Sequence, residues 1–374
     1  MEISRAQVFA YEGVCVVTSS IVFRVDSGAH IGNGHLFRCL SLAEEFRERE
    51  FNVSFICRKH HQNRNLYIKE RGFDLRELES NNDLIDLNNS EMWLGQTKEA
   101  EVIEVNELLS KISNVSLLVI DHYSIDVEFE KLFDVDRILV IDDLEREHCA
   151  NIIIDQSLSS SGTLYKRKNQ REEAKYLLGP RFALINKKFR RMREANSKRG
   201  SKRVLAYFGG LDLTNESMKV VNAFLSLNIE GYSMRVILPT EHKDFLALEE
   251  IARQKESIEL LSYTATMEKE IAESELCLGA SGVSIWERAC LCKPSIVITS
   301  ADNQLAGSKK LFEMGLLNLL GSGDSTTSDS WKSALSEYFD NPLRYQEVAM
   351  ELRKICDGDG IRRVTDIAIE ELAS

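Results

Sequence analysis

Short apolar runs alternate with longer amphipathic stretches along most of this chain, and this alternation most restricts the folds open to it. The runs 117–120 and 138–141 are apolar throughout, as expected for strands covered on both faces by helices. The stretches Leu40–Arg49 and Ala100–Ile112 instead place apolar residues at helical spacing. This rhythm predicts βαβ units with parallel strands, and therefore an α/β, doubly wound fold.

The rhythm runs through two series of expected strands. The first series is Ile21–Val25, Val53–Cys57, Leu117–Ile120, Ile138–Ile141 and Ile152–Ile154. The second series is Val204–Phe208, Ser233–Leu238, Ile258–Leu261, Leu276–Leu278 and Ser295–Thr299. We expect Thr214 or Asn215 to cap the helix that follows the first strand of the second series.

Basic residues concentrate between the two series, where the composition changes abruptly. This segment predicts a solvated helix followed by a polar linker, and it marks a domain boundary. We therefore predict an N-terminal extension at 1–20, a first lobe at 21–186, a basic linker at 187–201 and a second lobe at 202–374. In doubly wound lobes, ligands bind beyond the carboxyl ends of the strands.

Composition narrows the classes of partner. The chain has 374 residues, room for two domains, and a net charge of -12, which argues against nucleic acid or an anionic membrane as a general partner. Its eight cysteines show no zinc-site spacing and are expected to be reduced thiols. No apolar run is long enough to span a membrane. We expect a cytoplasmic monomer without cofactor or metal.

A glycine-bracketed turn, from Gly32 to His35, joins the first expected strand to an amphipathic helix. Glycine lets bare backbone approach a ligand closely, and the N–H groups of a helix N-terminus attract negative charge. At this position the positive end of the helix dipole favours a neutral imidazole, which can accept a proton. His35 is therefore a candidate general base beside an anionic substrate; the alternative is a structural histidine.

Polar side chains directly follow two further strands of the first series. Asp121 and Tyr123 follow one strand, and Asp142 and Asp143 follow the next. Carboxylates and a phenol at strand ends can hydrogen-bond sugar hydroxyls or orient a histidine. The aspartates can instead cap the turns that follow, and we expect this capping role for Asp143.

Two loops of small residues in the second half suit phosphate binding. Gly209 and Gly210 follow one expected strand, and the segment 279–284 follows another and precedes a helix. Successive backbone N–H groups and serine hydroxyls can hold a diphosphate. Glu287 lies about one helical turn later, where its carboxylate could accept hydrogen bonds from two ribose hydroxyls. The alternative is an ordinary helix N-terminus with a capping serine.

Together these motifs resemble the PseG-type UDP-sugar hydrolases, which remove UDP from UDP-2,4-diacetamido-2,4,6-trideoxy-β-L-altropyranose in pseudaminic acid biosynthesis. The resemblance runs in order from about residue 21 to the C-terminus. Its motifs are Arg24–Asp26, Ile31–His35, Arg38–Leu40, Asp121–Tyr123, Ile141–Leu144, Leu178–Pro180, Phe208–Asp212, Ser281–Glu287, Ala301–Gln304 and Asp357–Gly358.

The resemblance implies a GT-B fold, with the active site in the cleft between two Rossmann-like lobes. It implies that His35 is the catalytic base. The residues it assigns to the sugar are Arg24, Asp26, Gly34, Tyr123 and Asn303. The residues it assigns to UDP are Gly209, Gly210, Ser281, Gly282, Val283, Ser284 and Glu287.

The sequence thus predicts an inverting nucleotide-sugar hydrolase in which His35 activates water for attack on the anomeric carbon. A GT-B glycosyltransferase is the nearest alternative, because it would use the same UDP pocket and deliver the sugar to an acceptor. A silent nucleotide-sugar-binding protein is a third reading. The presence of a candidate base argues against this third reading.

Overall fold

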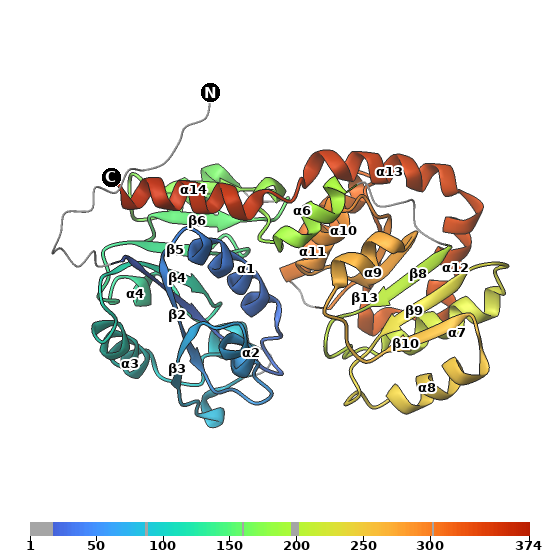
Figure 1. Ribbon diagram of the computed structural model, residues 1–374, viewed down its shortest axis with the longest axis horizontal. Helices are drawn as coiled ribbons and strands as arrows, with labels where there is room; N and C mark the ends of the chain where they lie inside the picture. The colour runs from blue at the N-terminus through green and yellow to red at the C-terminus, as the bar shows by residue number, and fades with distance from the viewer. Residues whose placement is uncertain (1–17, 87–88, 159–160, 196–201, 301–302) are drawn as a thin grey trace.

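Two parallel β-sheets, one in each lobe, carry the fold (Figure 1). The computed structural model describes residues 18–86, 89–158, 161–195, 202–300 and 303–374. Most of the predicted N-terminal extension and the end of the predicted linker lie outside these ranges. No helix in the described ranges is long and apolar enough to cross a membrane.

The first lobe contains a seven-stranded sheet in the order β3-β2-β1-β4-β5-β6-β7. Its strands are β1 (Ser20–Val25), β2 (Asn52–Arg58), β3 (Asp74–Leu78), β4 (Val115–Asp121), β5 (Ile138–Ile141), β6 (Ile152–Asp155) and β7 (Lys175–Leu178). The helices of this part are α1 (Gly34–Glu48), α2 (Asn65–Glu70), α3 (Lys98–Ser110), α4 (Val127–Glu130) and α5 (Gly162–Lys168), with 3-10 turns η1 (Asn82–Leu84), η2 (Ser90–Met92) and η3 (Pro180–Phe182).

The second lobe contains a six-stranded sheet in the order β10-β9-β8-β11-β12-β13. Its strands are β8 (Arg203–Tyr207), β9 (Ser233–Ile237), β10 (Ile258–Leu261), β11 (Leu276–Ala280), β12 (Ser295–Thr299) and β13 (Asn318–Ser322). The helices of the second half of the chain are α6 (Lys187–Glu194), α7 (Glu216–Leu227), α8 (Phe245–Gln254), α9 (Met267–Glu273), α10 (Ser284–Cys290), α11 (Asn303–Glu313), α12 (Ser328–Asp340), α13 (Pro342–Ile355) and α14 (Gly360–Leu372), with η4 at Gly323–Ser325.

Each sheet is buried on both faces, as the apolar strands predict. In β1, Ile21 and Phe23 belong to one core cluster, whereas Val22, which points to the opposite face, belongs to another. The two clusters lie on opposite sides of the sheet because successive side chains of a strand alternate in direction. The second sheet likewise separates two clusters.

Both sheets reverse their strand order beside their first strand. β1 pairs with β2 on one side and with β4 on the other, and β8 pairs with β9 and β11. Connections leave in opposite directions at such a switch point, which opens a crevice at the carboxyl ends of the two central strands. The turn leading to His35 follows β1, and Asp121 ends β4, so the topology brings these two segments together.

The chain crosses between the lobes twice. Helix α6 contacts α9 and α10 of the second lobe, and α14 contacts α1 and η3 of the first. Figure 1 shows α13 over the second lobe and α14 over the first. The last helix thus joins the core of the first lobe, with Val364 and Ala368 completely buried. The predicted second lobe, 202–374, therefore contains one helix that packs on the first lobe.

All ten predicted strands are present, but β3, β7 and β13 were not predicted. All three are edge strands, and their residues are mostly partly exposed, so they lack the continuous apolar pattern of a central strand. Asn215 occupies the predicted N-cap position of α7, but the expected side-chain bond is missing. The Asp212 carboxylate instead accepts the backbone N–H groups of Glu216 and Ser217, each at 2.8 Å.

Candidate active site

The turn that follows β1 faces two loops of the second lobe. A Cβ atom built on Gly210 would lie 3.5 Å from Asn33 Nδ2, and one built on Gly34 would lie 4.0 Å from Val283 Cγ2. The first lobe's turn therefore contacts both small-residue loops that were predicted to bind phosphate. These are ordinary van der Waals distances, so the two lobes lie in direct contact here without crowding.

A cleft of about 470 Å³ opens beside this contact, a volume within the range of small-molecule sites. Both lobes line it. The lining residues are Gly28, Ala29, Asn33, Gln62, Asn63 and Arg64 from the first lobe, and Gly210, Leu211, Asp212, Leu213, Pro239, Glu241, His242 and Lys243 from the second.

His35 is held by a buried carboxylate. Its Nδ1 lies 2.6 Å from Asp121 Oδ1, and the Asp121 side chain is completely buried. Arg38 Nη2 is 3.1 Å from the same nitrogen, but it donates to Asp121 Oδ1 at 2.6 Å. Because a carboxylate only accepts, Nδ1 carries the proton and Nε2 presents a lone pair. No described residue bonds that Nε2, and the side chain is 11% exposed.

The carboxylate of Asp121 remains ionised because the positively charged Arg38 guanidinium pairs with it. Arg38 donates through Nε to Oδ2 and through Nη2 to Oδ1, both at 2.6 Å. Burial alone would raise the pKa of Asp121, but the charges and hydrogen bonds of Arg38 and His35 outweigh burial and hold that pKa well below its usual range. A carboxylate–imidazole pair of this kind fixes the tautomer of a general base and stabilises the imidazolium that forms when the base takes a proton.

Tyr123 covers one side of this pair. Its ring lies edge-on to the His35 ring, with centroids 4.7 Å apart, and its hydroxyl donates to Asp143 Oδ1 at 2.7 Å. Burial and the nearby Asp143 charge raise the pKa of Tyr123 well above 10, so the phenol stays a donor.

The predicted capping role of Asp143 was wrong. Asp142 accepts the backbone N–H of Arg146 instead, at 3.0 Å.

Of the residues that the resemblance assigns to the sugar, Arg24, Asp26, Gly34 and Tyr123 are not among those that line the cleft. Arg24 and Asp26 are completely buried, and Arg24 donates two hydrogen bonds to Asp26, at 2.7 and 3.0 Å, and one to Glu101, at 2.6 Å. They fix the end of β1 below the turn. Asn303 begins α11, but its side chain lies outside the described part of the structure.

Asp26, His60 and His122 form the one group in the described ranges with the spacing of a metal site. His122 Nδ1 accepts the backbone N–H of Ser124 at 3.1 Å, so its proton is on Nε2, which points at Asp26 Oδ2 at 3.3 Å. Asp26 is already paired with the Arg24 guanidinium. A cation there would meet a buried positive charge and a protonated nitrogen, so the donor set does not fit a metal.

The two predicted phosphate loops offer unused backbone donors. Among the hydrogen bonds of the described residues, none uses the N–H of Gly209 or Gly210, or those of residues 282–284. Ser281 differs, because its N–H and its hydroxyl both donate to Ile298 O, each at 2.9 Å. A row of free N–H groups is a suitable binding place for an anion.

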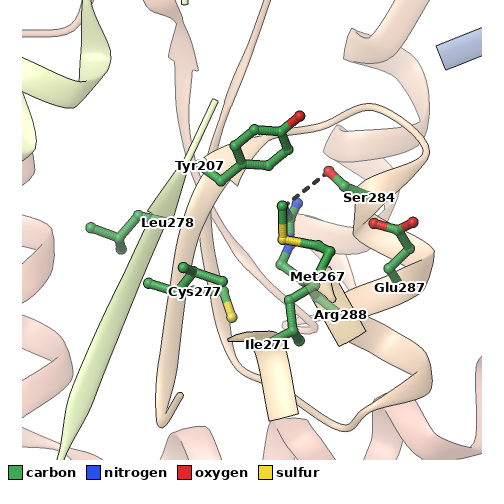
Figure 2. A pocket seen from close by; sticks show the side chains of 9 residues that line it. Tyr207, Met267, Ile271, Cys277, Leu278, Ser284, Glu287 and Arg288 are labelled. Carbon is green, nitrogen blue, oxygen red and sulfur yellow. Dashed lines mark hydrogen bonds between the residues drawn. The ribbon is translucent and has the colours of Figure 1, made fainter. Parts of the chain in front are cut away.

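A small recess beside α10 contains the predicted ribose residue. Figure 2 shows Glu287 and Ser284 along one wall, with Tyr207 and Met267 close by. Burial raises the pKa of Glu287 to about 7, although the neighbouring Arg288 charge lowers it. Arg288 was not singled out from the sequence, because nothing in the pattern distinguishes it from an exposed helical arginine. Arg64, which lines the cleft, was missed for the same reason.

Comparison with known proteins identifies distant relatives, and no family model matches the chain. An uncharacterized protein of Methanocaldococcus jannaschii is 23% identical over 293 residues, covering 74% of this chain and 55% of that protein. The spore coat polysaccharide biosynthesis protein SpsG of Bacillus subtilis is 24% identical over 192 residues, covering 50% and 56%. The chain thus spans little more than half the length of these two relatives. The UDP-2,4-diacetamido-2,4,6-trideoxy-β-L-altropyranose hydrolase of Campylobacter jejuni is 25% identical over 268 residues, covering 70% and 85%.

Solved structures share the architecture over nearly the whole chain. Acinetobacter baumannii MurG superposes with a TM-score of 0.65 at 12% identity, covering 93% of this chain and 99% of MurG. Medicago truncatula UGT71G1, complexed with UDP-glucose, gives 0.68 at 13%, covering 96% and 99%. The UDP-GlcNAc 2-epimerase of Neisseria meningitidis, bound to UDP-GlcNAc, gives 0.63 at 11%, covering 94% and 100%. With the two parallel sheets, these likenesses establish the predicted GT-B fold.

Proposed function

We propose that this GT-B chain is a nucleotide-sugar hydrolase that transfers the sugar of a UDP-sugar to water. The observation that carries the proposal is the pairing of His35 with the buried carboxylate of Asp121, directly opposite loops whose backbone N–H groups are free. One side of the interlobe contact thus offers a base, and the other offers an anion site. The distant relative that is a UDP-sugar hydrolase supports the same reading.

In the proposed reaction, the lone pair of His35 Nε2 accepts a proton from water, and the water oxygen attacks the anomeric carbon. The bond from that carbon to the diphosphate oxygen breaks, and UDP leaves with the electron pair. Attack from the face opposite the leaving group inverts the anomeric configuration. Asp121 stabilises the imidazolium that forms, and backbone N–H groups of the second lobe stabilise the charge on UDP.

The proposed substrate is UDP-2,4-diacetamido-2,4,6-trideoxy-β-L-altropyranose. We assign the diphosphate to Gly209, Gly210 and residues 282–284, and the ribose to Glu287. The sugar then lies between Gly34 and Tyr123. Ser281 supports its loop through its bonds to the neighbouring strand rather than contacting the ligand.

The second candidate is a glycosyltransferase that uses the same UDP pocket. The fold of UGT71G1, whose structure holds UDP-glucose, favours this candidate. Both reactions need a base near the anomeric carbon, so they differ in which hydroxyl that base deprotonates.

The test supplies the UDP-linked diacetamido sugar without an acceptor and follows UDP release. We expect UDP and free sugar in equal amounts, with label from oxygen-18 water entering the C1 hydroxyl of the sugar. His35→Ala should abolish turnover while UDP still binds. Release of UDP only after an acceptor is added would support the glycosyltransferase, and normal turnover by His35→Ala would exclude His35 as the base.

A further inference from the structure

Arg288, in the middle of α10, is a buried cation without a carboxylate partner. Its side chain is 3% exposed, and none of the described carboxylates lies within ion-pair distance of it. Its Nη1 donates to Ser284 Oγ at 3.1 Å and its Nη2 to Ala280 O at 2.9 Å. Its Nε has no hydrogen-bond partner among the described residues.

Other buried arginines of this chain are compensated. Arg24 pairs with Asp26 and Glu101, and Arg38 pairs with Asp121 and Asp143. Burial lowers the pKa of Arg288, and the nearby Cys277 and Glu287 only partly oppose this. An unpaired buried charge is destabilising unless something of opposite charge joins it. In the protein without a ligand, the buried charge of Arg288 therefore lowers the stability of the fold.

The backbone beside Arg288 is shaped around the guanidinium. A Cβ atom on Gly279 would lie 2.7 Å from Arg288 Nη1 and 2.6 Å from the backbone oxygen of Tyr207. Any side chain at position 279 would therefore displace the guanidinium or the neighbouring strand. The absence of a side chain at this position creates the space in which Arg288 reaches Ser284.

Ser284 connects this buried charge to the free backbone donors. Figure 2 shows its hydroxyl joined to the Arg288 guanidinium by a hydrogen bond, with Glu287 on the same helix. Ser284 Oγ accepts from Arg288, and its own proton is donated to Ala280 O over a long 3.5 Å. A closer acceptor at the mouth of the loop could take this proton instead. A phosphate oxygen at the N–H groups of residues 282–284 is the acceptor that this arrangement suits.

We propose that Arg288 is a positioning residue for the diphosphate of the nucleotide: it holds the Ser284 hydroxyl as a donor to a phosphate oxygen and supplies the positive charge that the diphosphate neutralises. This inference rests on the proposed function, because it assumes a nucleoside diphosphate in the second lobe. The inference predicts that Arg288 makes the site prefer UDP over uridine, which lacks the phosphates.

The test compares UDP with uridine, which lacks the phosphates, by isothermal titration calorimetry. In Arg288→Met, we expect UDP to bind at least 10-fold more weakly and uridine to bind within 2-fold of the native protein. The melting temperature should stay the same or rise, since an unpaired buried charge has been removed. The matched control is Arg235→Met in the same lobe. Arg235 pairs with Glu259 and Glu270, so this control should melt lower and bind UDP normally.

The role of the hydroxyl is tested with Ser284→Ala. If Arg288 acts through Ser284, then Arg288→Met, Ser284→Ala and the variant that combines them should lose similar UDP affinity, because the effects of linked groups are not additive. Additive losses would show that Arg288 does not act through Ser284. If Arg288→Met does not fold, Ser284→Ala alone decides: UDP selectivity over uridine should fall at least 5-fold, and unchanged selectivity would overturn the proposal.

The outcomes separate the two proposals. If the native protein binds neither UDP nor uridine, the proposed function fails and the role of Arg288 fails with it. If the native protein binds UDP and Arg288→Met binds it equally well, the role of Arg288 is refuted while the proposed function stands. Equal losses of UDP and uridine binding, with a lower melting temperature, would show a purely structural arginine and also refute the inference.

Discussion

Replacing Asp121 by Asn tests whether the buried carboxylate makes His35 a base. The substitution keeps the shape of the side chain and removes its charge. Asn offers one acceptor and one donor, whereas Asp121 accepts from His35 Nδ1, Arg38 Nε and Arg38 Nη2, all at 2.6 Å. At least one of these three donors must therefore face the amide N–H₂. If the nitrogen takes the Oδ1 position, His35 Nδ1 faces a donor and its tautomer is no longer fixed.

The size of the effect follows from the charges. The imidazolium and carboxylate charge centres are about 4 Å apart, and at an effective dielectric constant of about 20 their attraction is about 4 kcal/mol. Arg38 on the same carboxylate weakens the field at His35, so we take about 2–4 kcal/mol as the loss at the transition state. This corresponds to a fall in kcat of about 30- to 1,000-fold.

The assay is UDP release from the UDP-linked diacetamido sugar, with kcat and KM determined separately. We expect kcat to fall and the Kd for UDP to stay within 2-fold, because UDP is assigned to the other lobe. Stability should also decrease by about 3–5 kcal/mol, because Arg38 is left with only Asp143 at 3.3 Å. Circular dichroism must therefore show a folded variant at the assay temperature.

Asp143→Asn is the matched control. It removes a neighbouring carboxylate that bonds Arg38 and Tyr123 but does not touch His35, so its kcat should fall less than 10-fold. A kcat of Asp121→Asn within 3-fold of the native value would refute the reasoning. So would equal losses in both variants, because the effect would then come from Arg38 rather than from His35.

Two further predictions concern stability. Asp142 and Glu130 outweigh burial and raise the pKa of His148 to about 9, so the folded state holds a proton that the unfolded chain releases above about pH 6.5. The free energy of unfolding should therefore fall by up to about 3 kcal/mol as pH rises from 6.5 to 9; urea unfolding should show this slope reduced in His148→Gln, and an equal slope would contradict it. Gly360→Ala places its Cβ 2.3 Å from a backbone carbonyl of the first lobe, so the free energy of unfolding should fall by about 1–3 kcal/mol. The control Gly307→Ala has open space around its Cβ and should leave stability unchanged. Equal melting temperatures of the two variants would contradict the tight packing of α14.

The sequence predicted the parts of the fold that depend on burial. Central strands such as 117–120 and 138–141 are apolar because helices cover both faces of their sheet, so the pattern alone identifies them. Edge strands such as β3 carry polar residues because solvent reaches one side, so the same pattern is absent. The position of α14 could not be read either, because its amphipathic face is the same whichever lobe it covers.

The candidate site divides in the same way. The turn with His35 and the glycine loops were recognisable in the sequence because a tight turn and a close approach of backbone to a ligand both favour glycine. The family resemblance assigned Arg24 and Asp26 to the sugar, but the structure pairs them with each other in the core. Sequence spacing gives the strand end on which a residue lies, but not whether its charge is already neutralised by a neighbour.

By itself, the sequence determined the alternation of strands and helices, the division into two doubly wound lobes, and the strand ends that carry polar side chains. Only the tertiary structure decided which of these groups meet: Asp121 with His35 across 86 residues, and Asp143 with Tyr123 across 20. It also separated the compensated arginine Arg24 from the uncompensated Arg288. The physical reason is that hydrophobic periodicity is a local property of the chain, whereas pairing, burial and charge compensation depend on neighbours that the sheet topology brings together.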